Sequence, residues 1–252
     1  MEQRPLPPQT AACGTPRTRL ASSTVRPRGT LTTRPLLVKN LPYGPESFEA
    51  ICQTFELHIT LAVHKDSPFK TFADFMAAAK AKPETVSVGH TGIGSPPHLA
   101  LAHLESISGI KLNHIAYRGD GQLLQNLAGN HVQVAASGMG AVTGREDMRM
   151  LVMFGDKRDP GNPNVPTVIE SGFPVERVAA GGLYAVKGLP ADVKKKLSDG
   201  CVAAIKTPAY LAVAGKLKQP VAYLDGPAWD RRLAAETKVN RELIAKLGIQ
   251  AE

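Results

Sequence analysis

The chain has 252 residues, 43% of them hydrophobic, which is enough for the core of one large domain or two smaller ones, and its net charge is +8. No run approaches the roughly 18 consecutive apolar residues of a membrane-spanning helix, which excludes a transmembrane helix. Most of the charge lies in residues 1–40, which hold six arginines and one lysine against one glutamate. The nearly neutral remainder lacks a basic, aromatic-interleaved surface, so no nucleic-acid partner is predicted.

Three cysteines, Cys13, Cys52 and Cys201, form no CxxC motif and no cysteine and histidine spacing that suits zinc. Their odd number excludes a complete internal disulfide framework. A single bridge between two of them remains open, so the count leaves the redox compartment undecided.

The first 35 residues are rich in proline, threonine, serine and arginine, and they show neither helical nor alternating apolar periodicity. This composition predicts a disordered or non-native tail. The basic start is not followed by a continuous apolar segment of about 7–15 residues, which excludes a secretory signal peptide. An arginine-rich transit peptide is the alternative, although the proline content disfavours it.

The body of the chain alternates short strands with amphipathic helices. Residues 59–63 (ITLAV) predict a strand. Thr71 then offers a helix N-cap, with Asp74 at the third helical position, and Pro83 ends the helix. The apolar face of this helix has helical spacing and consists of Phe72, Phe75, Met76 and Ala79.

The same strand and helix unit repeats along the rest of the chain. Strands are expected at 85–88, 112–117, 131–136, 148–154 and 182–186, and helices at about 97–108, 120–128, 190–205, 208–217 and 227–247. Gly129 and Gly248 close two of these helices. Strands separated by helices of this length make right-handed crossovers, which predicts an α/β fold with a doubly wound parallel sheet.

The glycine-rich stretch 88–100 (VGHTGIGSPPHLA) lies between an expected strand and an expected helix. In such a unit the loop is at the carboxyl end of the strand, where ligands of open α/β sheets bind. Ser95 is the expected N-cap, and Pro96 and Pro97 suit the first helical turn because its N–H groups lack intrahelical partners. The free N–H groups of residues 91–94 and the positive end of the helix dipole would suit an anion.

Spacing argues against three better-known glycine and serine motifs in this loop. A dinucleotide fingerprint from Gly92 would need glycine at Pro97, a P-loop would need Gly-Lys-Ser/Thr, and a nucleophile elbow would need glycine two residues beyond Ser95. Ser95 and His98 lack a third group to orient the histidine. Capping and ligand contact are therefore favoured over a catalytic pair.

A second glycine loop, Gly138 to Gly144, follows an expected strand and has a GxGxxxG pattern, with Asp156 after the next strand. This pattern supports an alternative interpretation of the chain as an NAD(P)-dependent oxidoreductase, which would bind its cofactor with Gly138, Gly140, Gly144 and Asp156. The stretch 141–147 is too short for the crossover helix of a dinucleotide unit, which disfavours this alternative.

Several segments, in the family's order and over most of the chain, resemble the substrate-binding receptors of tripartite tricarboxylate transporters, the Bug-type extracytoplasmic solute receptors. They are LPYGP at 41–45, GIGSPPHLA at 92–100, HIAYRG at 114–119, DKR at 156–158, NVPTV at 164–168 and SGFP at 171–174. Their combination is specific, although no single segment is.

The resemblance implies a two-lobed periplasmic-binding-protein fold of type II, with one lobe of residues 64–176 and an incomplete lobe of residues 36–63 and 177–252. It implies a monomeric receptor, not an enzyme, that needs no cofactor or metal, binds a small carboxylate and delivers it to the membrane subunits of a tripartite transporter. The matching ligand-binding positions are Thr91, Gly92, Gly94, Ser95, His98, Tyr117, Arg118, Ser137, Gly138 and Met139. Packing in the core is the alternative role for His98 and Tyr117.

The start of the chain departs from the family pattern. Family members begin with a secretory signal and a first strand that ends in a proline-glycine-glycine loop with an aspartate, and residues 1–40 match neither. We therefore expect a truncated or frame-shifted start, an exposed sheet edge and reduced or absent ligand affinity. The resemblance implies a periplasmic location, with retention in the cytoplasm as the alternative because no signal peptide is found.

Overall fold

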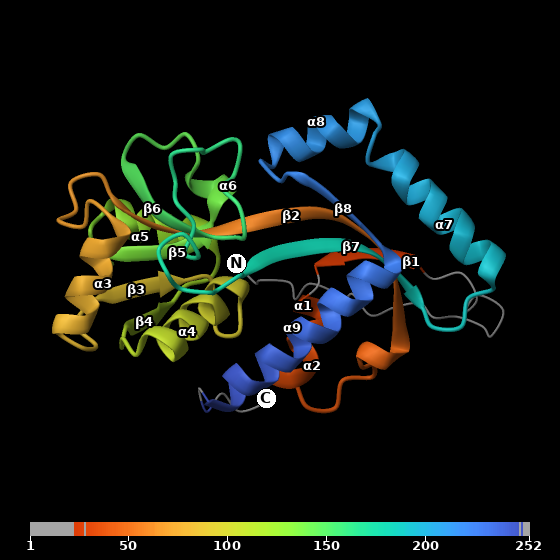
Figure 1. Cartoon of the computed structure of the whole chain (residues 1–252), viewed down its shortest axis with the longest axis horizontal. Coiled ribbons are helices and arrows are strands. Elements are labelled where there is room, and N and C mark those ends of the chain that lie inside the picture. The colour runs from red at the N-terminus through yellow and green to blue at the C-terminus, as the bar shows by residue number, and fades with distance from the viewer. Residues whose placement is uncertain (1–22, 28, 247, 249–252) are drawn as a thin grey trace, which may run out of the picture.

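Strands and helices alternate along most of the chain in the computed structural model, which describes residues 23–27, 29–246 and 248 (Figure 1). The strands are β1 (Ser23–Pro27), β2 (Phe48–His64), β3 (Ser87–His90), β4 (Asn113–Ala116), β5 (Val134–Gly138), β6 (Met148–Phe154), β7 (Val178–Val186) and β8 (Val221–Asp225). The helices are α1 (Gly29–Thr32), α2 (Arg34–Leu37), α3 (Phe72–Ala81), α4 (Pro96–Ser108), α5 (Asp120–Ala128), α6 (Met139–Val142), α7 (Ala191–Ala204), α8 (Pro208–Lys216) and α9 (Gly226–Lys246). The α/β class agrees with the sequence analysis.

Strand direction differs from the expected parallel sheet. Strands β3, β4 and β5 are parallel, with Val88 opposite both His114 and Val134. The long strand β2 instead runs antiparallel to β5, β6, β7 and β8. The β/α units connect only the three parallel strands, so the alternation of strands and helices carried no information on how β2 would pair.

Strand β2 belongs to both halves of the molecule. Its first part pairs with β7, from Phe48 opposite Val186 to His58 opposite Val178, and its last residues pair with β5 and β6. Figure 1 shows β2 and β7 running side by side from the half with α3, α4 and α5 to the half with α7, α8 and α9. These two strands therefore connect the two halves.

The apolar core is divided in the same way. The largest buried cluster includes Phe75, Leu101 and Phe154 and packs α3 and α4 against the strands beside them. Another buried cluster joins Tyr184 of β7 to Trp229 of α9, and the Trp229 indole N–H donates to the Tyr184 hydroxyl at 3.0 Å. None of the described helices is both long and apolar enough to cross a membrane.

A disulfide between Cys52 and Cys201 ties β2 to α7. Both cysteines are buried. The sequence had left one bridge open, and the structure forms it between these two residues. Cys13 lies outside the described residues.

The helix after Thr71 begins as its sequence predicts. The Thr71 hydroxyl accepts from the Asp74 amide at 3.2 Å, and the Asp74 carboxylate accepts from the Thr71 amide at 2.8 Å. These hydrogen bonds lower the pKa of Asp74. The N-cap prediction is therefore confirmed, and a reciprocal capping box strengthens it.

The N-terminal segment is a correction to the expected disorder of residues 1–35. Within its described part, residues 23–27 form β1, which pairs antiparallel with β7, and residues 29–32 and 34–37 form two short helices. Pairing with the edge of another strand orders residues whose own pattern shows no periodicity. Residues 1–22 lie outside the described residues, so the expected disorder of this stretch stays a prediction.

Candidate functional site

The three loops predicted to bind a ligand follow the three parallel strands. Residues 91–95 follow β3, residues 117–119 follow β4, and residues 137–139 lie at the end of β5 and the start of α6. Because parallel strands place their carboxyl ends at one edge, the structure brings the three loops to the same edge of the sheet.

The glycine loop forms the expected turn into α4. Ser95 is the N-cap, and its hydroxyl accepts from the His98 amide at 3.4 Å, with Pro96 and Pro97 in the first turn. Gly92 has a φ of 122° and Gly94 a φ of 71°, a backbone region in which glycine is favoured. The prediction of the cap is therefore confirmed.

The amides of this loop are engaged inside the loop. The Gly94 amide donates to Nδ1 of His98 at 2.9 Å, and the Gly92 amide lies 3.3 Å from Nδ1 of His90. A Cβ at Gly94 would also collide with the side chain of Leu37, so α2 covers this part of the loop. An anion bound by the Gly94 amide would first have to displace Nδ1 of His98.

His98 and Tyr117 lie in packed surroundings. His98 is buried. Burial is the main reason that its pKa is lowered to about 3, and the neighbouring His90 lowers the pKa further, so the ring is neutral at physiological pH. The Tyr117 ring packs over Gly89 and against the apolar cluster of α5. Arg118 is exposed, and its backbone amide donates to Gln122.

Residues 137–139 lead from the sheet into a cavity. Ser137 is fully buried, and its hydroxyl donates to the carboxylate of Asp120 at the start of α5. Gly138 packs against the side chain of Leu57 in β2. Met139 is the only one of the ten predicted site residues that lines this cavity, within the described part of the chain.

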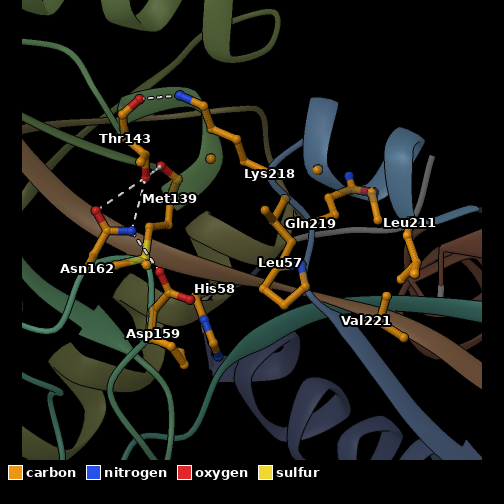
Figure 2. A pocket seen from close by; sticks show the side chains of 16 residues that line it. Leu57, His58, Met139, Thr143, Asp159, Asn162, Leu211, Lys218, Gln219 and Val221 are labelled. Carbon is orange, nitrogen blue, oxygen red and sulfur yellow. Dashed lines mark hydrogen bonds between the residues drawn. The ribbon is translucent and has the colours of Figure 1, made fainter. Parts of the chain in front are cut away.

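The cavity has a volume of about 470 Å³ and lies between α6 and the turn from α8 to β8 (Figure 2). One wall is polar: the Asn162 amide group donates to the Asp159 carboxylate at 2.7 Å and to the Thr143 hydroxyl at 3.2 Å. The facing wall is mainly apolar and contains Leu57, Leu211 and Val221. Such a mixture of apolar surface and a few fixed polar groups is typical of small-molecule sites.

Lys218 connects the two walls. It lies in the turn before β8, and its ammonium group donates to the backbone carbonyl of Thr143 in Figure 2. Among the described residues that line the cavity, Lys218 is the only lysine or arginine. It therefore supplies the permanent positive charge of this cavity.

The sequence analysis missed Lys218, Asn162 and Asp159. Asp159 and Asn162 lie in one loop, Lys218 lies far from that loop in the chain, and none of the three belongs to a glycine motif. The one local signal was the family resemblance of residues 156–158 and 164–168, which flank the loop of Asp159 and Asn162 without including it.

The sequence matches a family described as "Tripartite tricarboxylate transporter family receptor" over residues 18–249. A UPF0065 protein of Cupriavidus necator is 30% identical over 191 residues, which cover 75% of this chain and 58% of that protein. A UPF0065 protein of Agrobacterium vitis is 30% identical over 220 residues, which cover 84% of this chain and 64% of that protein. The chain thus spans roughly three fifths of the length of these relatives.

Solved structures with the same fold support this match. A TctC solute binding protein from Polaromonas, solved without ligand, is 25% identical with a TM-score of 0.81, over 89% of this chain and 77% of that one. Two Rhodopseudomonas palustris proteins, both 21% identical, share the fold. The protein solved with adipate has a TM-score of 0.75, and the match covers 90% of this chain and 78% of that protein. The protein solved with bound malate has a TM-score of 0.71, and the match covers 90% of this chain and 82% of that protein.

Proposed function

Because the chain belongs to the receptor family of tripartite tricarboxylate transporters, we propose that it binds a small carboxylate and delivers it to the membrane subunits of such a transporter. Members of this family are periplasmic receptors and not enzymes. Adipate and malate, found with two proteins of the same fold, are both dicarboxylates, which supports a ligand of this class.

The observation that carries the proposal is the cavity between α6 and the turn before β8, with Lys218 at its edge. An ammonium group has three N–H donors, and the carbonyl of Thr143 takes one of them. The other two are available to a carboxylate. The apolar wall of Leu57, Leu211 and Val221 would then contact the carbon chain of the ligand.

The polar wall limits what else can bind. Both N–H groups of the Asn162 amide have partners, and the Thr143 hydroxyl donates to the carbonyl of Met139 at 2.9 Å. The Asp159 carboxylate is buried on the same side and repels a second anion there. We therefore expect one ligand carboxylate at Lys218 and the other directed away from Asp159.

The proposal includes two lobes, one of residues 64–176 and one of residues 36–63 with 177–252. The paired strands β2 and β7 connect them. The separate apolar clusters around Phe75 and around Trp229 support two lobes, and because Ile59, Leu61 and Val63 pack in the Phe75 cluster, the end of β2 packs with the lobe of residues 64–176. Because α6 and the turn before β8 would belong to different lobes, closure of the lobes would tighten the cavity around its ligand.

The oxidoreductase alternative gains no support from these observations. Residues 139–142 of the second glycine loop form the short helix α6, which is one turn long, whereas a dinucleotide unit uses a full crossover helix. The family is one of receptors. A buried disulfide between Cys52 and Cys201 is also compatible with an oxidising compartment such as the periplasm.

A ligand screen tests the proposal. The melting temperature of the full chain would be measured with citrate, succinate, malate, adipate, glutamate, nicotinate and NAD. A true ligand at 100 times its dissociation constant stabilises the native state by about 2.7 kcal/mol. Stabilisation by NAD and by no carboxylate would contradict the proposal.

A substitution then locates the site. Lys218→Gln should weaken binding of the carboxylate found in the screen by about tenfold or more, because a charge-assisted hydrogen bond contributes about 1.5–3 kcal/mol. Lys216→Gln is the matched control, since Lys216 is exposed at the end of α8 and does not line the cavity. Equal affinity of the Lys218→Gln variant and the wild type, measured by calorimetry, would place the ligand elsewhere.

A further inference from the structure

Three histidines meet beside the glycine loop. His90 ends β3, His98 lies in the first turn of α4, and His114 lies in β4. The ring centroids of His90 and His98 are 4.3 Å apart, and that of His114 is 5.7 and 5.4 Å from the two. Each ring offers a nitrogen within 4.8 Å of the others, and we propose that the three bind a divalent transition metal ion such as Zn²⁺.

The hydrogen bonds of His114 orient it as a ligand. Its Nε2 lies 2.9 Å from the Glu105 carboxylate, whose other oxygen accepts from the Leu112 amide at 2.8 Å. Nε2 therefore carries the proton and Nδ1 the lone pair. Among the described residues, Nδ1 of His114 is buried without a hydrogen-bond partner. A carboxylate on the outer nitrogen of a histidine is the usual second contact in zinc sites.

His90 is held in a matching state. Its Nδ1 lies 2.9 Å from the carbonyl of Gly92 and 3.3 Å from the Gly92 amide, and in the tautomer that donates to the carbonyl, the shorter contact, Nε2 keeps its lone pair for a metal. His90 is only 2% exposed, and burial disfavours the charged form of an imidazole. Its ring is thus neutral at physiological pH, the form that coordinates metals.

His98 links the metal site to the glycine loop. Its Nδ1 accepts from the Gly94 amide, which leaves the proton of the neutral ring on Nε2. The His98 ring is stacked on that of His90 with an interplanar angle of 17°, so to coordinate through Nε2 it must rotate out of the stack and move this proton to Nδ1, and the Gly94 amide must turn away. Gly94 is in a glycine-rich loop with a φ of 71°, where such a turn meets little steric resistance from the residue itself.

The donor set selects the class of metal. Neutral imidazoles suit Zn²⁺, Cu²⁺, Ni²⁺ and Co²⁺ and do not suit Mg²⁺ or Ca²⁺, which require oxygen ligands. Three histidines and one solvent molecule form a known type of zinc coordination. The Glu105 carboxylate behind His114 offsets part of the positive charge that enters the cluster.

Calorimetry with ZnCl₂ on the untagged full chain, after treatment with a chelator, tests the proposal. We expect one zinc ion per chain with micromolar or tighter affinity. His90→Gln and His114→Gln should each weaken binding by about tenfold or more, and Glu105→Gln by about 10–100-fold. His131→Gln is the control, because His131 is an exposed histidine in the turn before β5. No binding, or equal binding by all variants, would overturn the proposal.

X-ray absorption of the zinc-loaded wild-type protein gives a second test that needs no variant. Scattering from two or three imidazole rings at the metal supports the site. Scattering from fewer than two imidazole rings overturns the proposal. Because this measurement uses the wild-type protein, it decides the question even if a histidine variant fails to fold. Neither measurement uses a carboxylate, so the outcome is independent of the proposed receptor function.

Discussion

Removal of the Cys52–Cys201 disulfide should cost a large share of the conformational stability. The bridge connects residues with a sequence separation of 149, and it joins β2 to α7. In the chain-entropy model, a closed loop of this length lowers the entropy of the unfolded chain by about 17 cal/mol/K, or about 5 kcal/mol at 25 °C. Domains typically have only about 5–15 kcal/mol of stability in total.

The double variant Cys52→Ala/Cys201→Ala removes the cross-link without leaving a buried thiol. Its free energy of unfolding would be measured in urea by the fluorescence of Trp229, which is buried in the native state. We expect a loss of about 2–5 kcal/mol relative to the wild type, both expressed in an oxidising compartment. Cys13→Ser, which changes the third cysteine, is the control and should leave the stability of the bridged protein unchanged.

Two results would refute this reasoning. Alkylation of the denatured, unreduced wild type followed by mass spectrometry should find one free thiol, and three would show that the bridge does not form. A double variant as stable as the wild type would show that closure of this loop contributes nothing to the native state.

Three further predictions concern the core, the cap of α4 and the buried histidines. Phe75→Ala should lower the free energy of unfolding in urea by about 3–5 kcal/mol, since Phe75 is fully buried against Phe69 and Phe72; a loss below 1 kcal/mol would contradict this packing. Ser95→Ala should cost about 1 kcal/mol by removing the N-cap, whereas an unchanged value would mean that the hydroxyl does not cap α4. With a chelator present, stability should fall from pH 7 to pH 5, because burial lowers the pKa of His90 to about 4 and of His98 to about 3. The unfolded histidines take up protons over this range and the native ones do not, so each lowers stability by up to about 1.4 kcal/mol per pH unit, and equal stability at both pH values would contradict the shifts.

Local signals in the sequence predicted the β/α units and their caps. Thr71 with Asp74, and Ser95 before two prolines, each satisfy the amide groups of a helix start with side chains nearby in the chain. The helix at 120–128 ends at Gly129 as expected. These features depend on contacts within a few residues, so the sequence by itself determined them.

The pairing of strands that lie far apart in the chain could not be predicted from such local signals. Only residues 59–63 of the long strand β2 were expected, and β1 and β8 were not expected at all. Each of these strands is held by a partner far away in the chain, such as β7 for β1. Residues 55–64 of β2 do alternate apolar side chains, but the hydrogen bonds that set the length and the partners of each strand come from the partner backbone, which the strand's own sequence does not specify.

The candidate sites divide along the same line. The sequence by itself determined that three loops at 91–95, 117–119 and 137–139 follow parallel strands, because each loop is set by the strand before it. Only the tertiary structure decided that Lys218 reaches Thr143 across a cavity, and that His90, His98 and His114 meet. Those contacts depend on how separate elements pack, and no spacing within one segment encodes that distance.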